Sequence, residues 1–323
     1  MRRIPRKVEA PMDANPEKQS ASAVLMIRPA NFGANPETAA SNSFQKQNAS
    51  GAEIQVRALA EFDALSAALQ AAGVMVEVFE DRSEPVTPDA VFPNNWVSFH
   101  ADGSAWLYPM LALNRRWERR PDILEALKAE RGYSLSDVHD LSYSELDGRY
   151  LEGTGSLVLD RTNRVAYAGL SPRTDARLLQ DWATRAGYEV VRFHARDTKG
   201  RPIYHTNVML CVGTRFALGC FDCIADAKER EKAMTRLLDT GHEVIGISPY
   251  QMESFAGNIL ELAGRYGESM IVMSARAERA LTPTQRMVLE KHGRIVASPI
   301  ETIEDHAGGS VRCMLAEIHL PRI

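Results

Sequence analysis

One cysteine near the end of the chain lies in a setting suited to nucleophilic chemistry. Cys313 follows the segment GGSVR, in which two glycines let the backbone approach a ligand closely and leave amide N–H groups available to an oxyanion. The neighbouring Arg312 would favour the thiolate. A lone cysteine is equally compatible with a buried apolar residue that opens a strand. Cys313 is therefore our candidate nucleophile, with a structural thiol as the alternative.

Two further residues could supply acid–base chemistry to such a thiol. His205, in YHTN, lies between polar residues and the apolar run VMLCV. One imidazole can both activate a thiol and protonate a departing nitrogen. Glu152, in LEGTGS, begins an apolar segment where a buried carboxylate needs a partner, so it could orient His205 or accept hydrogen bonds from a substrate. A structural histidine and a solvated loop glutamate are the alternatives.

Two other sequence patterns are weaker evidence for a functional site. Cys220 and Cys223 have the spacing of half a zinc site or a redox motif, but no second pair accompanies them, so we predict structural thiols. The stretch RRWERR (115–120) is interpreted as the exposed face and first turns of a helix. A phosphate site is the weaker interpretation of that stretch.

The elements that must position these residues recur along the chain. Apolar spacing predicts a helix over 53–72, ended by Gly73 and followed by an alternating strand at 74–79. The same order of helix, glycine and strand is predicted for helices near 175–186, 226–239 and 283–291. Segments of strand, turn and strand lie between them, and a last partial copy, GGSVRCMLAEIHLP, closes the chain.

Self-similarity at a period of roughly 50 residues is typical of closed rings of modules, and a terminal half-unit that completes the first module would close such a ring. We predict an α/β protein with one closed domain of five hairpin-plus-helix modules over residues 21–323, preceded by a disordered tail at 1–20. An open α/β sheet would also fit the alternation but leaves the hairpins unexplained.

Alignment of the hairpins identifies the position at which the first strand of each module begins. Equivalent positions in a ring face its axis, so polar residues at these strand starts, with Glu152 and His205, should converge on one central pocket. The aligned residues are Asn95, Gly155 or Ser156, Asn207, Asn258 and Cys313.

Composition excludes several classes of partner. The 323 residues are 45% hydrophobic, enough for a sizeable core. A net charge of -4 with both signs well mixed gives no reason to expect nucleic acid or an anionic membrane, and no apolar run approaches the roughly 20 residues of a membrane helix. Four unevenly spread cysteines indicate free thiols in a reducing cytosol. A small molecule is the expected partner, and the oligomeric state is left open.

Five motifs, FPNNW, LEGTGS, SPRTD, YHTN and GGSVRC, occur in this order and together resemble the guanidine-modifying (amidinotransferase) superfamily over residues 24–320. This superfamily includes arginine deiminases, dimethylarginine hydrolases and glycine amidinotransferases. The resemblance implies a five-bladed β/α propeller, the pentein fold, and chemistry at a carbon–nitrogen bond without metal or cofactor. It also implies that Cys313 is the nucleophile, aided by His205 and the acidic residue Glu152.

The opening MIRPANFGANPET, with FPNNWVSFH and YPM, is most similar to the branch of citrulline-utilisation hydrolases. The resemblance implies that Arg173, in the SxRT motif, binds the substrate carboxylate and that Phe92 lies over the planar end group. Asn95 and Asn207 occupy places where deiminases have aspartates. Gly308 lies near where arginine deiminases have an arginine, so the mode of substrate binding of those enzymes is not fully retained.

The two asparagines direct the choice of substrate. A guanidinium offers only donors and a positive charge and suits carboxylates, whereas a ureido group offers donors and a carbonyl acceptor and suits amides. We predict cysteine-dependent hydrolysis of citrulline to ornithine, carbon dioxide and ammonia through a covalent intermediate, although either nitrogen could leave first. The alternatives are a deiminase or dimethylaminohydrolase of a guanidino group, an amidinotransferase, and a non-catalytic small-ligand binding protein.

Overall fold

Five stretches of the chain each fold into a three-stranded sheet of the same plan. The computed structural model describes residues 17–39, 42, 44 and 51–323. In every sheet the first two strands pair antiparallel, and the third strand lies parallel to the second. The sheets are β15 (Ala316–Glu317), β1 (Ala23–Arg28) and β2 (Met75–Glu80); β3 (Val97–Phe99), β4 (Ser104–Leu107) and β5 (Asp137–Asp140); β6 (Val158–Asp160), β7 (Val165–Gly169) and β8 (Glu189–Phe193); β9 (Leu210–Val212), β10 (Phe216–Gly219) and β11 (Glu243–Gly246); and β12 (Leu260–Ala263), β13 (Ser269–Ser274) and β14 (Arg294–Ser298).

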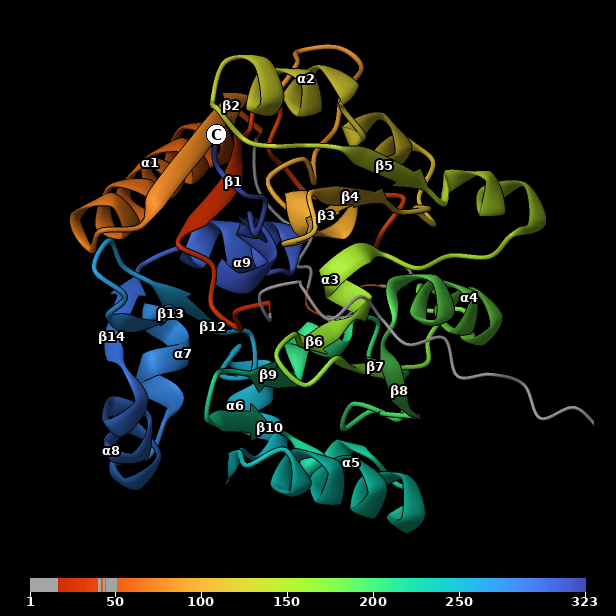
Figure 1. Cartoon of the computed structure of the whole chain (residues 1–323). Helices are drawn as coiled ribbons and strands as arrows, with labels where there is room; N and C mark the ends of the chain where they lie inside the picture. The colour runs from red at the N-terminus through yellow and green to blue at the C-terminus, as the bar shows by residue number, and fades with distance from the viewer. Residues whose placement is uncertain (1–16, 40–41, 43, 45–50) are drawn as a thin grey trace, which may run out of the picture.

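The two ends of the chain share one sheet. The C-terminal strand β15 pairs with β1, placing Glu317 opposite Val24 and Ala316 opposite Leu25. This pairing closes the five modules into a ring, as Figure 1 shows. The α/β fold of five hairpin-plus-helix modules is thereby confirmed, and the open sheet is excluded.

A helix joins the second and third strands of each module and lies on the outer side of the ring (Figure 1). Capping residues fix where two of these helices begin. The carboxylates of Asp175 and Asp226 each accept hydrogen bonds from two backbone N–H groups of the first turn. The four predicted ranges match their helices to within two residues. The joining helices are α1 (Gly51–Ala71), α2 (Pro121–Ala129), α4 (Ala176–Ala186), α5 (Ala227–Asp239) and α8 (Pro283–His292); shorter helices are α3 (Gly153–Ser156), α6 (Pro249–Glu253), α7 (Ala275–Ala280) and α9 (Glu301–Ala307).

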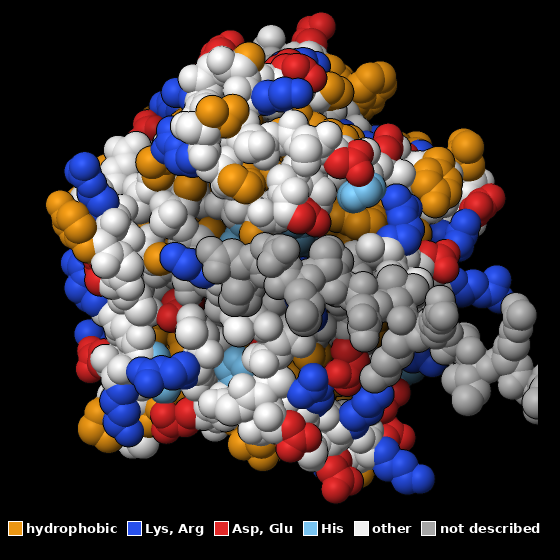
Figure 2. Space-filling view, viewed as in Figure 1, with side chains coloured by type: hydrophobic (Ala, Val, Ile, Leu, Met, Phe, Trp, Pro, Cys, Tyr) orange, Lys and Arg blue, Asp and Glu red, His pale blue; other side chains and the backbone are white. Residues whose placement is uncertain are grey.

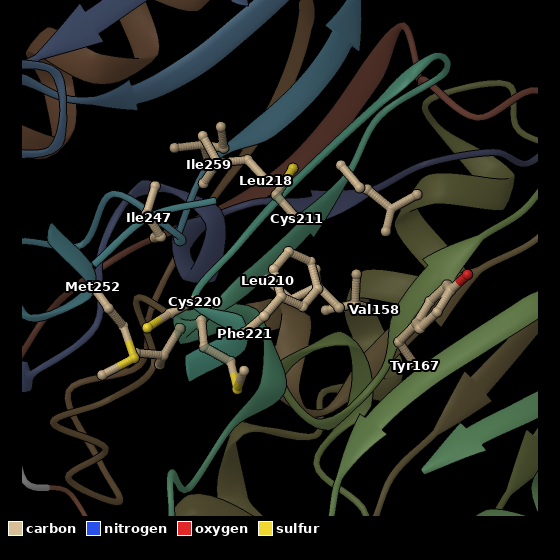
Figure 3. Packing of buried hydrophobic residues seen from close by; sticks show 14 of the residues in the cluster. Val158, Tyr167, Leu210, Cys211, Leu218, Cys220, Phe221, Ile247, Met252 and Ile259 are labelled. Carbon is tan, nitrogen blue, oxygen red and sulfur yellow. The ribbon is translucent and has the colours of Figure 1, made fainter. Parts of the chain in front are cut away.

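Apolar side chains fill the space between neighbouring modules. Val158, Leu210 and Ile259, near the start of three successive first strands, belong to one buried cluster (Figure 3). Each apolar side chain of this size stabilises the fold by about 1.5–3 kcal/mol when fully buried. Because the cluster crosses module boundaries, the first strands are held in fixed positions around the axis.

The segment before β1 is part of the folded structure from residue 17. Gln19 is buried and donates to the carbonyl oxygens of Leu159 (2.8 Å) and Val212 (2.9 Å), which joins two modules. Glu17 is also buried and pairs with Arg161 at 2.7 Å. The predicted disordered tail at 1–20 therefore extends too far at its C-terminal end, because buried polar contacts fix residues 17–20. Its remainder, residues 1–16, lies outside the described residues.

Two properties of the described residues bear on the expected partners. None of their helices is long and apolar enough to cross a membrane. On the face shown in Figure 2, basic and acidic side chains are interspersed around the rim.

Candidate active site

A tight turn precedes the first strand of each module, and polar contacts join the turns in sequence. Thr154 donates to the carbonyl oxygen of Asn94 (3.3 Å), and Thr206 donates to that of Ser156 (2.6 Å). Asn258 continues the series by donating to the carbonyl oxygen of Asn207 (2.9 Å). These turns include η1 (Pro93–Asn95), α3, η4 (Thr206–Val208), residues 255–258 and η6 (Val311–Met314).

A small pocket, referred to below as the cavity, opens beside these turns. Five of the seven residues predicted for the site line it, namely Phe92, Asn95, Arg173, His205 and Cys313. The other two touch members of this group: Glu152 bonds His205, and Asn207 contacts the sulfur of Cys313. Residues distant in sequence are thus brought together. The remaining lining residues are Asn42, Asp89, Arg115, Tyr204, Ala307, Gly308 and Gly309.

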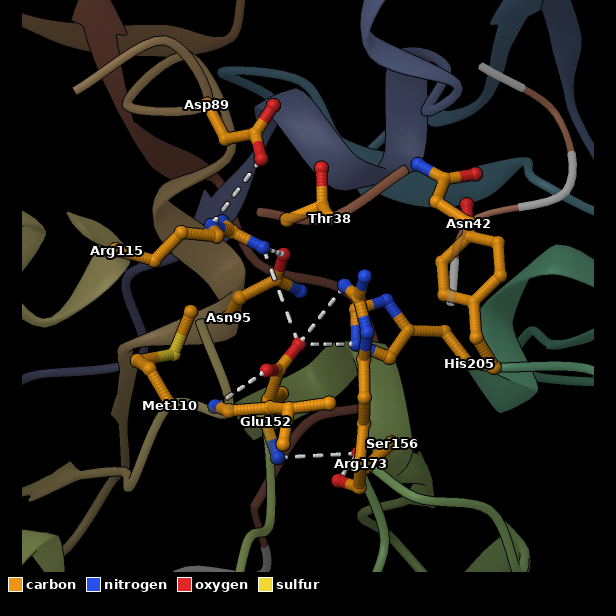
Figure 4. Close-up of polar contacts among 12 residues, drawn as sticks. Thr38, Asn42, Asp89, Asn95, Met110, Arg115, Glu152, Ser156, Arg173 and His205 are labelled. Atoms are coloured by element: carbon orange, nitrogen blue, oxygen red, sulfur yellow. Dashed lines mark hydrogen bonds and ion pairs between the residues drawn. The ribbon is translucent and has the colours of Figure 1, made fainter. Parts of the chain in front are cut away.

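His205 and Glu152 form a buried pair. Nε2 of His205 lies 2.7 Å from Oε2 of Glu152 (Figure 4). An ionised carboxylate can only accept, so the Nε2–H donates and Nδ1 is left to take up a proton. Glu152 also accepts from the guanidinium of Arg173 (3.2 Å) and from the backbone N–H of Leu111 (3.0 Å). Burial alone would raise the pKa of Glu152, but Arg173, His205 and Arg115 together lower it below its usual value.

The imidazole is in its basic form at neutral pH. Burial lowers the pKa of His205 to about 4, and the hydrogen bond to Glu152 offsets only part of that effect. If His205 is the base, kcat/KM should stay level as the pH falls below neutrality and decline only near pH 4, because neutral imidazole persists until then. The measurement is a pH profile of substrate turnover, with circular dichroism at each pH to verify folding.

A variant of an exposed histidine, His194→Gln, serves as the control and should leave the profile unchanged. An acidic limb centred on the ordinary imidazole value of about 6.5 would contradict this assignment of the base.

The glycines before Cys313 allow an aromatic ring to approach the backbone. A Cβ at Gly309 would lie 2.7 Å from the ring of Phe92, so only glycine fits beneath it. The carbonyl oxygen of Gly308 accepts from the hydroxyl of Tyr204 at 2.5 Å. These contacts fix the loop ahead of Cys313, whose side chain is only 3% exposed.

Comparison with known proteins gives a family for this arrangement. The model of a family described as N,N dimethylarginine dimethylhydrolase, eukaryotic, matches residues 28–320. The chain belongs to this family. Its members are hydrolases of carbon–nitrogen bonds within the guanidine-modifying superfamily, which confirms the predicted superfamily and enzyme class. Among curated proteins, no sequence matches the chain.

Solved structures of low sequence identity confirm the fold of this dimethylarginine dimethylhydrolase family member. The N-terminal domain of ArgZ, an arginine dihydrolase from the ornithine–ammonia cycle in Cyanobacteria, superposes with a TM-score of 0.70 at 19% identity, covering 93% of this chain and 99% of that domain. The chain spans only 41% of full-length ArgZ. A dimethylarginine dimethylaminohydrolase variant with an S-methyl-L-thiocitrulline adduct gives a TM-score of 0.61 at 17% identity, covering 92% and 100% of the two chains.

The interpretation of RRWERR as the exposed face of a helix is wrong. Residues 114–118 form a short 3-10 turn, and α2 begins only at Pro121. Arg115 is buried, and its Nε and Nη2 each donate to the Glu118 carboxylate at 2.9 Å, so its charge is satisfied without solvent. It lines the cavity and donates to Oδ1 of Asn95 at 3.1 Å (Figure 4).

Arg312 does not support the thiol in the way expected from its position in sequence. Its guanidinium bonds Glu317 (2.7 Å) and the carbonyl oxygen of Leu315 (2.9 Å). It lines a second cavity together with Gln19 and Cys211, separate from the cavity beside Cys313. The charge of Arg312 is therefore engaged elsewhere.

The remaining thiols of this family member lie apart from the site. Cys211, Cys220 and Cys223 are buried and free, as predicted, and the sulfurs of Cys220 and Cys223 are 3.0 Å apart. Within residues 17–39, 42, 44 and 51–323, no group of three or more His, Cys, Asp or Glu side chains is arranged to hold a metal ion.

Proposed function

We propose that the enzyme hydrolyses the ureido group of citrulline, with Cys313 as nucleophile, releasing ornithine and then carbon dioxide and ammonia. The observation that carries this proposal is the orientation of the Asn95 amide. A guanidinium can only donate, so the group facing Arg115 must be the amide oxygen of Asn95. The Nδ2 donor of Asn95 is buried and has no hydrogen-bond partner among the described residues.

A ureido oxygen matches that donor, whereas a guanidinium does not. The carbonyl oxygen of citrulline can accept from Nδ2 of Asn95. A guanidinium in the same place would set donor against donor, and an unsatisfied buried donor costs about 1–3 kcal/mol. Arg115 is itself held by Glu118, so the amide has little freedom to turn over.

The charges near the sulfur support the same substrate. Cys313 contacts the neutral amides of Asn207 (3.6 Å) and Asn258 (3.3 Å). The carboxylate of Glu152 is already engaged by His205 and Arg173. A neutral end group therefore fits this part of the pocket better than a cation does.

The mechanism needs one nucleophile and one base. His205 takes the proton of Cys313, and the thiolate attacks the ureido carbon while Nδ2 of Asn95 holds the developing oxyanion. The carbon–nitrogen bond to the ornithine side chain breaks as His205 returns the proton to that nitrogen. Water, activated by His205, then cleaves the S-carbamoyl group to carbamic acid, which decomposes to carbon dioxide and ammonia. Arg173 binds the substrate carboxylate, and the ring of Phe92 lies over the ureido plane.

Arginine is the second candidate, because one carboxylate of the pocket is incompletely engaged. Asp89 lines the cavity, and its buried Oδ1 has no hydrogen-bond partner within the part of the chain that the structure describes. A guanidinium could pair with it. Under the citrulline proposal, the same oxygen accepts from the substrate α-ammonium.

Incubation of purified protein with citrulline, arginine or dimethylarginine, each alone, tests the proposal. Ornithine released from citrulline is the expected result. Turnover of arginine or dimethylarginine without turnover of citrulline would overturn it. Formation of a guanidino product only when a second amine is added would identify an amidinotransferase, and binding without turnover would identify a ligand-binding protein.

The substitution Asn95→Asp should reverse the substrate preference. It keeps an oxygen for Arg115 but replaces the Nδ2 donor by a charged acceptor, so kcat/KM for citrulline should fall by about 10²–10³, the cost of losing one oxyanion donor. Activity on arginine relative to citrulline should rise. The measurement is kcat/KM for both substrates, with Gln180→Glu, at an exposed position of α4, as the matched control. An unchanged kcat/KM for citrulline would contradict the role of Asn95.

A further inference from the structure

Asn258 is a fully buried amide placed directly against the sulfur of Cys313. Its Nδ2 lies 3.3 Å from Sγ, closer than the 3.6 Å between Nδ2 of Asn207 and the same sulfur. The side chain is 0% exposed and belongs to the turn that precedes β12. It precedes β12 at the same point at which Cys313 precedes β15 in its own module.

Three contacts fix which end of this amide faces the sulfur. Oδ1 accepts from the backbone N–H of Arg312 at 3.1 Å, a group that can only donate. The NH2 group carries two hydrogens, and it has two acceptors, the carbonyl oxygen of Asn207 at 2.9 Å and Sγ of Cys313 at 3.3 Å. The amide therefore presents a donor to the sulfur.

The backbone holds this donor in place. A Cβ at Gly257 would lie 2.5 Å from the carbonyl oxygen of Val208, so the turn bearing Asn258 packs directly on η4. This close approach requires glycine. The amide of Asn258 is thus held by a rigid turn on one side and contacts the sulfur of Cys313 on the other.

We propose that Asn258 is a catalytic residue that stabilises the thiolate of Cys313 by donating an N–H hydrogen bond to Sγ. Hydrogen bonds to the ionised form of an acid favour that form. This contribution matters here because the guanidinium of Arg312 bonds Glu317 instead. The proposal rests on Cys313 being the nucleophile of the proposed function, but it does not depend on which substrate is used.

The rate at which iodoacetamide alkylates Cys313, measured against pH without substrate, tests this role. Asn258→Asp keeps the acceptor for Arg312 but removes the donor and adds a negative charge. Alkylation at pH 7 should slow by roughly tenfold or more, and its midpoint should move to higher pH, because the thiolate loses its donor. Asn258→Ala should move the midpoint in the same direction, and peptide mass spectrometry identifies the alkylated residue.

Gln180→Glu also replaces a neutral amide by a carboxylate, at an exposed position of α4, and should behave as the unmodified protein does. A midpoint equal to that of the unmodified protein in a folded Asn258 variant would overturn the proposal, even if its melting temperature is lower, because a purely structural role affects stability alone. If Asn258→Asp does not fold, the alkylation midpoint of Asn258→Ala tests the proposal instead. Failure of citrulline turnover leaves this test intact, since no substrate enters it.

Discussion

Replacement of Cys313 by alanine should lower the turnover of citrulline by about four orders of magnitude or more while the protein stays folded, because no other group can form the covalent intermediate. The side chain is small and contacts two neutral amides, Asn207 and Asn258, so its loss leaves no buried charge unpaired. The measurements are kcat with citrulline and the melting temperature by circular dichroism.

Cys211→Ala is the matched control for the alanine variant of Cys313. Cys211 is also buried, and burial raises the pKa of its thiol well above the usual range. It lies in β9, beside the second cavity, and should be dispensable for turnover. More than about a hundredth of the original kcat in a folded Cys313→Ala protein would exclude Cys313 as the nucleophile.

Glu152→Gln should lower kcat by about 10³ and destabilise the fold. The carboxylate orients His205 through Nε2 and partly neutralises Arg173. A glutamine could present its NH2 group to either partner, and removing one member of a buried ion pair costs about 3–5 kcal/mol. The loss of orientation alone accounts for the fall in rate. The measurements are kcat with citrulline and the free energy of unfolding in urea.

The control variant Glu145→Gln separates the effect of Glu152→Gln on kcat from its effect on stability. Glu145 is also well buried and is bonded by Arg119 and Arg116, but it does not line the cavity. It should lose stability and retain kcat. Comparable losses of kcat in both variants would show that Glu152 acts only through the stability of the fold.

The ring could be predicted because its signals are local. Helices ended by glycine and short hairpins recur at regular spacing, and the aligned strand starts included Asn207, Asn258 and Cys313. Residues carried by connecting loops gave no such periodic signal. Asp89 lies before η1 and Arg115 after β4, so the alignment of strand starts passed over both.

Arg115 was also misassigned for a physical reason. A charged stretch ordinarily indicates a solvated surface, and only the three-residue spacing between Arg115 and Glu118 hints at the ion pair that lets both be buried. The orientation of the Arg312 side chain could not be predicted from sequence either. Its partner Glu317 lies on the following strand, and the two side chains meet away from the thiol. Sequence indicated the composition of the site but not which charges were already engaged.

The central claim is that Cys313 accepts a carbamoyl group from citrulline. Citrulline labelled with carbon-13 at the ureido carbon should, after acid quenching during turnover, leave the label as a carbamoyl group on the peptide that contains Cys313, with unlabelled ornithine in solution. Absence of label from Cys313 while ornithine accumulates, or label arriving only from guanidino-labelled arginine, would contradict the account.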